Sequence, residues 1–185
     1  IMGFEEPDEG QVILGPTVKL GYFSQENESL DPSQRVIDYI RDTAEYVKTE
    51  DGMVSASVML ERFLFDATLQ YSLIGKLSGG EKRRLYLLKV LMEAPNILIL
   101  DEPLSGVDVG GEHLVLDMLD EIRQKYDLSI LFSTHDFSTL RHYADKVILL
   151  QQTILKTGTP GEVLSSPEFR SVFHLDLGEK GGSAQ

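Results

Sequence analysis

The sequence predicts an α/β domain with a parallel sheet at its core. Short apolar runs such as Ile97–Leu100 and Ser129–Phe132 are typical of strands that are buried on both faces of a sheet. Amphipathic helical patterns stand between such runs, and strands that alternate with helices favour parallel pairing. The length of 185 residues suits one domain, 1–185, with a sizeable core.

Two short strands are expected near the start of the chain. They are Gly10–Leu14 and Thr17–Phe23, and the turn dipeptide Gly15-Pro16 separates them.

A helical subdomain is expected over residues 31–75. Asp31-Pro32 has the residue types of an N-cap and a first helical turn. Apolar residues at helical spacing extend this first helix to about Lys48. After a polar break at Thr49–Gly52, a second helix is expected over Ser55–Phe65.

The middle of the chain predicts a loop, a helix and a buried strand. Lys76–Gly80 is the loop, and Glu81–Glu93 is a helix with a wide apolar face that stops at Pro95-Asn96. Ile97–Leu100 is the strand. The helix that follows has four apolar residues on one face: Val115, Met118, Leu119 and Ile122.

The C-terminal part predicts a buried strand, Lys146–Leu150, and a short strand, Ile154–Lys156. Two small helices are expected near Glu162–Leu164 and Glu168–Phe173. The tail Gly178–Gln185 is small and polar, so it is expected to be disordered.

The composition excludes several classes of function. The formal net charge is -13, and direct DNA binding is not expected because nucleic-acid binders present a basic face. The chain has no cysteine, which excludes disulfides and thiolate metal sites and fits a cytoplasmic location. No apolar run approaches the roughly 18 residues that a membrane-spanning helix needs.

Two adjacent carboxylates, Asp101 and Glu102, directly follow the apolar run Ile97–Leu100. In open α/β sheets, ligands bind beyond the carboxyl ends of the strands. One carboxylate there can hold Mg²⁺, and its neighbour can polarise an attacking water. The alternative is a strand followed by an ordinary acidic turn.

A second motif, Leu77–Glu81, reads Leu-Ser-Gly-Gly-Glu and begins a helix. Its glycines let the backbone approach a ligand closely, and the Ser78 hydroxyl and the free amides of a helix start suit a phosphate. The alternative is a glycine-rich turn in which Ser78 is only a cap. This motif stands shortly before the paired carboxylates, and the two together are far more specific than either one.

With these motifs the chain resembles the ATP-binding-cassette (ABC) ATPase family. Leu77–Glu81 is similar to the signature motif of that family, and Ile97–Glu102 is similar to its Walker B strand. The resemblance implies a P-loop NTPase-like fold with a parallel sheet core, an inserted helical subdomain and a small antiparallel β part. It also implies ATP and Mg²⁺ as cofactors, with Asp101 serving the metal and Glu102 acting as the catalytic base.

Within this resemblance, Ser78, Gly79 and Gly80 would bind the nucleotide of a second ABC ATPase domain in a homo- or heterodimer. Two cassettes would enclose two ATP molecules, each held by one subunit's phosphate loop and the other's signature loop.

Further residues match the family's other motifs. Gln25 matches the Q-loop glutamine, which binds nucleotide or Mg²⁺, and His135 matches the switch histidine, which senses the γ-phosphate. Ser105 and Asp108 fall in the D-loop, which contacts the opposite subunit. Ordinary alternatives remain, since such a histidine is often structural, such a glutamine is often a surface residue, and Asp108 suits a helix cap.

Three consecutive basic residues, Lys82, Arg83 and Arg84, follow the signature motif. They are expected to form a solvated helix face, and a contact with RNA or a partner is the less favoured reading.

The resemblance differs between the two halves of the chain. Gly10–Pro103 is most similar to the soluble ABC-F subfamily, which acts on ribosomes, whereas the rest, including Gly158–Leu164, is more similar to importer subunits such as those for metal ions. The leading interpretation is an ATPase domain coupled to membrane transport. Its partners would be permease subunits, and it would lie in the cytoplasm, peripheral to the inner face of the membrane. A ribosome-associated ATPase is the alternative.

The P-loop of the family, Gly-x-x-x-x-Gly-Lys-Ser/Thr, does not occur in the 185 residues. The Gly75-Lys76 pair is followed by Leu77. Family members carry this Walker A segment upstream of the part that this chain resembles, so the chain alone is expected to be inactive. A second hypothesis is therefore a catalytically dead module that binds another cassette.

Overall fold

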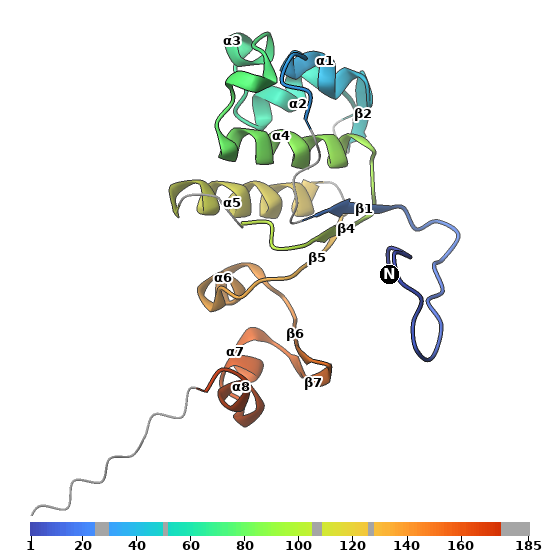
Figure 1. Cartoon of the computed structure of the whole chain (residues 1–185), viewed down its shortest axis with the longest axis vertical. Coiled ribbons are helices and arrows are strands. Elements are labelled where there is room, and N and C mark those ends of the chain that lie inside the picture. Colours follow the sequence, from blue (N-terminus) through green and yellow to red (C-terminus); the bar gives the residue numbers. More distant parts are fainter. Residues whose placement is uncertain (25–29, 50–51, 105–108, 126–127, 175–185) are drawn as a thin grey trace, which may run out of the picture. The chain divides into compact units, whose positions relative to one another are not determined.

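The computed structural model describes residues 1–24, 30–49, 52–104, 109–125 and 128–174 (Figure 1). The chain forms two compact units, Ile1–Thr134 and His135–Gln185. The tail Gly178–Gln185, for which disorder is predicted, lies outside the described residues. Within the described ranges, no helix combines the length and the apolar character that crossing a membrane requires.

A three-stranded parallel sheet lies in the first unit. Its strands β1 (Leu20–Phe23), β4 (Ile97–Leu100) and β5 (Ser129–Phe132) follow the order β1-β4-β5, so β4 is central. Leu100, the last residue of β4, is opposite both Phe23 and Phe132, so all three strands end at the same edge. The predicted α/β class with a parallel sheet core is confirmed.

Strand β5 is less buried than the sequence predicts. Leu98 and Leu100 of β4 are fully buried, whereas Leu131 of β5 is 45% exposed. In the described part of the chain β4 is the strand that pairs with β5, which places β5 at the edge of the sheet. An apolar strand is buried on both faces only where other elements cover both, so the expectation of a fully buried strand is wrong here.

The N-terminal β structure forms only in part. The predicted turn at Gly15-Pro16 is present, and the Val18 N–H donates to the Gly15 carbonyl over 3.1 Å. Gly10–Leu14, however, is not a strand, and its apolar side chains are exposed. A strand needs a neighbour that completes its hydrogen bonds, and within the described residues this segment has none, so this predicted strand is wrong.

Short helices and a β-hairpin occupy the stretch for which a helical subdomain is predicted. The helices are α1 (Val36–Arg41), α2 (Ala56–Arg62), α3 (Ala67–Gln70) and the short 3₁₀ helix η1 (Ile74–Lys76). The hairpin pairs β2 (Tyr46–Thr49) antiparallel with β3 (Gly52–Ser55).

The first helix of this stretch is shorter than predicted. It ends at Arg41, and Tyr46–Thr49 forms a strand whose side chains alternate between exposed and buried. Val47 fits both the helical spacing of the preceding apolar residues and the two-residue period of a strand, and pairing with β3 decides between them. The extension of this helix to Lys48 is therefore wrong. The second predicted helix is confirmed as α2, and Ser55 is its N-cap.

The helix that follows the signature loop, α4 (Gly79–Met92), packs against β1, α1 and α2. It begins earlier than predicted, because Ser78 and Glu81 form a reciprocal capping box that draws Gly79 and Gly80 into the first turn. The next helix, α5 (Val109–Lys125), follows β4 in the chain.

The second unit contains a β-hairpin and three helices in its described part. The hairpin pairs β6 (Val147–Gln151) antiparallel with β7 (Thr153–Gly158). The helices are α6 (Phe137–Tyr143), α7 (Pro160–Leu164) and α8 (Pro167–Val172), and the last two confirm the predicted small helices. The predicted strand Lys146–Leu150 forms as β6, but the expectation that it is buried is wrong for one of its faces, because only the other face meets α7 and α8.

Candidate functional site

The two predicted carboxylates lie at the carboxyl edge of the parallel sheet. The Asp101 N–H donates to the Phe23 carbonyl over 2.9 Å, which continues the pairing of β1 with β4 by one residue. Asp101 and Glu102 are both half-buried. Burial and the nearby charge of Asp101 raise the pKa of the Tyr22 phenol on β1.

Ser133, which directly follows β5, binds both carboxylate residues. Its hydroxyl donates to Asp101 Oδ1 over 2.8 Å, and its Oγ accepts the N–H of Glu102 over 2.9 Å. The Ser133 N–H in turn donates to the Leu100 carbonyl over 2.9 Å. Sequence reasoning missed Ser133. The signal was its place directly after a predicted parallel strand, since such strands end at one edge.

The main chain of Glu102 is in the left-handed region, with φ of +46°. For a residue other than glycine this conformation costs roughly 1–2 kcal/mol, and such strained residues persist where their surroundings hold them. The conformation turns the chain sharply at the end of β4. Contacts to the two peptide groups of Glu102 must maintain this strained conformation. The direction of the Glu102 side chain therefore depends on those contacts.

Arg83 on α4 is one of these contacts, although the sequence predicted a solvated position for it. The residue is only 4% exposed, and its guanidinium lies 4.4 Å from the centre of the Phe23 ring. Three main-chain carbonyls accept from it: Pro103 (3.2 Å from Nε), Ser24 (3.4 Å from Nη1) and Glu102 (2.9 Å from Nη2). Burial lowers the pKa of Arg83, while the charges of Tyr86 and Asp101 act in the opposite direction.

The expectation of a solvated basic face is therefore wrong for Arg83, because its face of α4 meets the loops at the carboxyl ends of β1 and β4. The neighbouring Arg84 is half-buried, and its guanidinium lies 5.7 Å from the centre of the Phe65 ring.

The signature loop is exposed at the start of α4. Ser78 Oγ accepts the Glu81 N–H over 3.3 Å, and the Ser78 N–H donates to Glu81 Oε2 over 2.7 Å. Ser78 is thus an N-cap, as one reading of the sequence proposed. Apart from adjacent residues and the nearby backbone of α4 itself, no described atom lies within 4 Å of a Cβ added at Gly79 or Gly80, so packing of the described residues does not require glycine there.

The described structure does not test the other predicted site residues. Gln25, Ser105 and Asp108 lie outside the described residues. His135 is an exposed residue and belongs to the second unit, whereas the carboxylates belong to the first. The roles predicted for these four residues stay predictions.

The carboxylates at this edge of the sheet suit a magnesium ion whose other ligands are phosphate oxygens. Among the described residues there is no group of three or more histidines and carboxylates that could form a complete protein cage for a metal. Mg²⁺ is commonly held by one or two carboxylates, with phosphate oxygens and water as its other ligands. Asp101, oriented by Ser133, fits this requirement.

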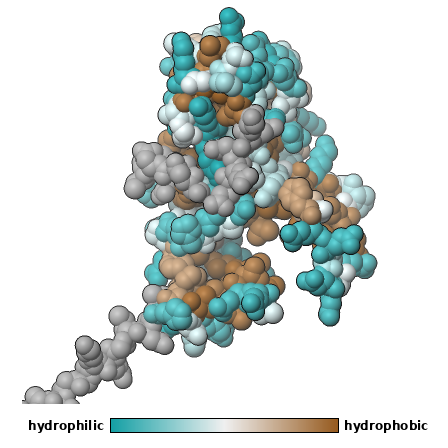
Figure 2. Space-filling view, viewed as in Figure 1, coloured by the Kyte–Doolittle hydropathy of each residue, from teal (hydrophilic) through white to brown (hydrophobic). Residues whose placement is uncertain are grey.

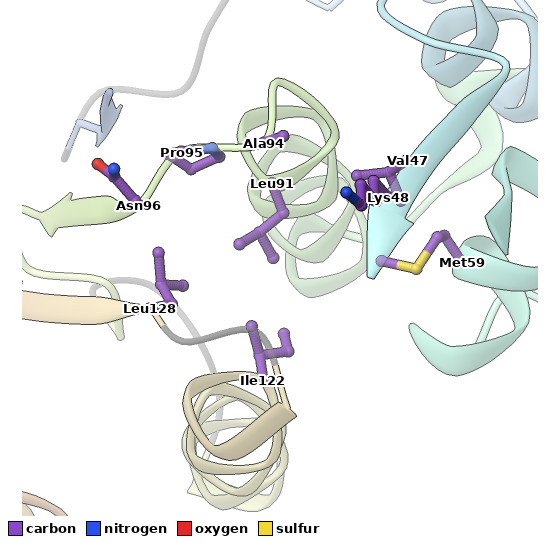
Figure 3. Close-up of a pocket in the computed structure, with 9 residues that line it drawn as sticks. All are labelled: Val47, Lys48, Met59, Leu91, Ala94, Pro95, Asn96, Ile122 and Leu128. Carbon is purple, nitrogen blue, oxygen red and sulfur yellow. The ribbon is translucent and has the colours of Figure 1, made fainter. Parts of the chain in front are cut away.

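A cavity of about 220 Å³ lies in the first unit, away from these residues (Figure 3). It opens between the C-terminal end of α4, strand β2 and α5, and most of its lining is apolar. Its lining residues are Val47, Lys48, Met59, Leu91, Ala94, Pro95, Asn96, Ile122 and Leu128. None of the predicted site residues is among them, so the cavity is not part of the candidate site.

Comparison with known proteins identifies the family. The family model for the ABC transporter matches residues 1–105. The "Uncharacterized ABC transporter ATP-binding protein YfmR" of Bacillus subtilis is 43% identical over 152 residues, which cover 82% of this chain and 24% of that protein. The "Zinc import ATP-binding protein ZnuC" of Photorhabdus laumondii is 33% identical over 175 residues, which cover 94% of this chain and 65% of that protein.

Solved protein structures share this fold. CbiO1 from Clostridium perfringens, part of the ABC transporter complex cbiONQ, superimposes with a TM-score of 0.63 at 25% identity, over 85% of this chain and 64% of that one. The chain thus spans less than two thirds of the length of these relatives. The motifs, the fold and these likenesses agree, and the chain belongs to the ABC transporter family of ATP-binding proteins.

Proposed function

We propose that this chain forms the catalytic-carboxylate part of an ATPase domain that couples ATP binding and hydrolysis in a dimer to transport across a membrane. The observation that carries the proposal is the group formed by Asp101, Glu102 and Ser133 at the carboxyl edge of the sheet. Two carboxylates with different environments stand there side by side, and one of them is already oriented by a hydroxyl.

In this proposal each carboxylate has one role. Asp101 serves the Mg²⁺ of the nucleotide, and the bound metal would neutralise charge on the phosphates. Glu102 is the general base that orients and deprotonates the attacking water. The residue is half-buried, and its held main chain limits the directions in which the side chain can point.

The signature loop would act on the nucleotide of a second ABC ATPase domain. The exposed start of α4 offers backbone amides to a phosphate, and the open space beside Gly79 and Gly80 permits close approach. Ser78, Gly79 and Gly80 are the residues assigned to this contact.

The remaining assignments rest on the sequence motifs. Gln25 would contact the nucleotide or Mg²⁺, and His135 would sense the γ-phosphate. Ser105 and Asp108 would contact the opposite subunit of the dimer.

The likeness to ZnuC supports a transport role with membrane permease subunits as partners, and with the chain in the cytoplasm at the inner face of the membrane. The names of these two relatives refer to an ABC transporter and to zinc import, and neither supports the ribosome-associated alternative.

The test is hydrolysis of Mg-ATP by two proteins: the 185-residue chain, and the same chain extended upstream by a strand, a Gly-x-x-x-x-Gly-Lys-Ser/Thr loop and its helix. The extended protein should bind ATP and release phosphate, because positioning and charge stabilisation of the phosphates need that loop. The unextended chain should do neither to a measurable extent. An extended protein that binds ATP tightly without hydrolysis would instead favour the dead interaction module.

A further inference from the structure

The proposed function gives no role to Arg83, although its side chain is the most deeply buried of the charged residues in the described site. Replacing a solvated arginine on a helix changes stability little. Arg83, however, is buried, donates hydrogen bonds to three main-chain carbonyls and lies over the ring of Phe23. Phe23 also stacks on Tyr86 at a ring distance of 5.0 Å. The guanidinium is therefore fixed between the end of β1 and the end of β4.

The two peptide groups of Glu102 are held from opposite sides. Its N–H donates to Ser133 Oγ, after β5, and its carbonyl accepts from Arg83 Nη2, on α4. The next carbonyl, that of Pro103, accepts from Nε of the same guanidinium. Because the left-handed φ of Glu102 is unfavourable for glutamate, loss of one of these contacts would let the main chain relax and rotate the carboxylate.

We propose that Arg83 is a positioning residue, which holds the Glu102 main chain in its left-handed conformation and thereby directs the Glu102 carboxylate toward the attacking water. This inference rests on the proposed function of Glu102 as the general base. Arg83 lies on the helix that begins with the signature loop, and its third carbonyl partner, Ser24, directly precedes Gln25. The Arg83 side chain thus connects three parts of the proposed site. They are Glu102, the helix that begins with the signature loop, and the segment that leads into the Q-loop.

Geometry explains why the residue is arginine. The planar guanidinium presents donors in several directions at once and lies flat on an aromatic ring, whereas a lysine ammonium is a compact donor on a flexible stem. The substitution Arg83→Met keeps an apolar stem over Phe23 but removes every donor. Arg83→Lys keeps the charge and can satisfy fewer of the carbonyls.

The first measurement is amide hydrogen exchange in the 185-residue chain, which needs no ATP. In Arg83→Met, the amides of Asp101, Glu102 and Leu104 should exchange faster, while those of the β2–β3 hairpin should not change. Lys89→Met is the matched control, since it makes a similar change on the same helix and removes an ammonium that lies 5.2 Å from the centre of the Tyr39 ring. It should leave residues 101–104 unchanged. Equal exchange at these residues in parent and Arg83→Met overturns the proposal.

The second measurement is steady-state ATP hydrolysis by the extended protein. Arg83→Met should lower kcat by about 10–100-fold and leave KM within about twofold, because a misplaced base costs rate without weakening nucleotide binding. Arg83→Lys should be intermediate, and Lys89→Met should match the parent. A normal kcat in Arg83→Met overturns the proposal. A parent that does not hydrolyse ATP overturns the proposed function and with it the positioning role, whereas the exchange experiment still decides whether Arg83 holds the main chain.

Discussion

At the scale of single residues, the environment of Glu102 distinguishes it from Asp101. The side chain of Asp101 accepts a hydrogen bond from Ser133, which fixes one of its oxygens. Glu102 uses Ser133 through its main chain instead. The fixed side chain of Asp101 suits the metal-binding role, and the role proposed for Glu102 depends on the direction that its held main chain gives to the carboxylate.

The substitution Glu102→Gln tests this assignment in the extended protein. It preserves size but removes the base, so turnover should fall by about 10²–10⁴-fold while ATP binding persists. Phosphate release and ATP affinity are the two readouts. Glu93→Gln is the control, because it makes the same chemical change at the exposed C-cap of α4 and should have no effect on either. Turnover close to that of the parent in Glu102→Gln would remove Glu102 from the mechanism.

At the scale of elements, two glycines show how packing and function make different demands. A Cβ added at Gly21, on β1, would lie 2.9 Å from Pro95 Cγ and 3.0 Å from Val90 Cγ1. Val90 lies in the last turn of α4 and Pro95 shortly after that helix, and the ring of Pro95 has little freedom to move aside. Gly21 is therefore required for the packing of α4 on the sheet, whereas the described residues leave open space at Gly79.

The variants Gly21→Ala and Gly79→Ala should consequently differ in stability. Gly21→Ala should lower the free energy of unfolding by about 1–3 kcal/mol, as overpacked core substitutions do. Gly79→Ala should change it little or raise it by about 0.5–1 kcal/mol, because alanine favours the helical conformation. Urea unfolding of the 185-residue chain gives both values. In the extended protein, Gly79→Ala should still impair hydrolysis, and full activity would argue that no ligand approaches this glycine.

At the scale of the whole molecule, each unit leaves apolar residues exposed. In the first unit, Leu131 lies on the edge strand β5. In the second unit, the face of the β6–β7 hairpin opposite its small core exposes Ile148 (49%), Leu150 (66%) and Ile154 (63%). Figure 2 shows hydrophobic side chains at the surface of this unit. Edge strands and exposed apolar patches favour association.

The 185-residue chain on its own should therefore self-associate in a concentration-dependent way, which sedimentation velocity measures. Replacing Ile148 and Leu150 together by threonine should reduce the association, because threonine is less apolar than either residue and still favours a strand. Thr153→Ser is a control on the same hairpin. A parent chain that stays monomeric at high micromolar concentration would contradict the prediction.

Local sequence signals were sufficient wherever a structure depends on neighbouring residues. Ser78 as a possible N-cap, the strand Ile97–Leu100 and the place of Asp101 and Glu102 at its end follow from spacing and residue type. Hydrophobic spacing gave the wrong element at Tyr46–Thr49, because over so few residues the spacing of a helix and that of a strand cannot be distinguished. There, pairing with β3 decided the outcome, and no residue within the segment carries that information.

The sequence by itself determined the family, the parallel sheet core and the place of the two carboxylates at the end of its central strand, because these are carried by contiguous motifs and by periodicity. Only the tertiary structure decided that Ser133 and Arg83 hold Glu102 from two sides. Both residues are distant from Glu102 in the chain, and each looks ordinary in its own segment. Whether an arginine on a helix is solvated or buried depends on which elements pack against its face, and that is a property of the assembled fold.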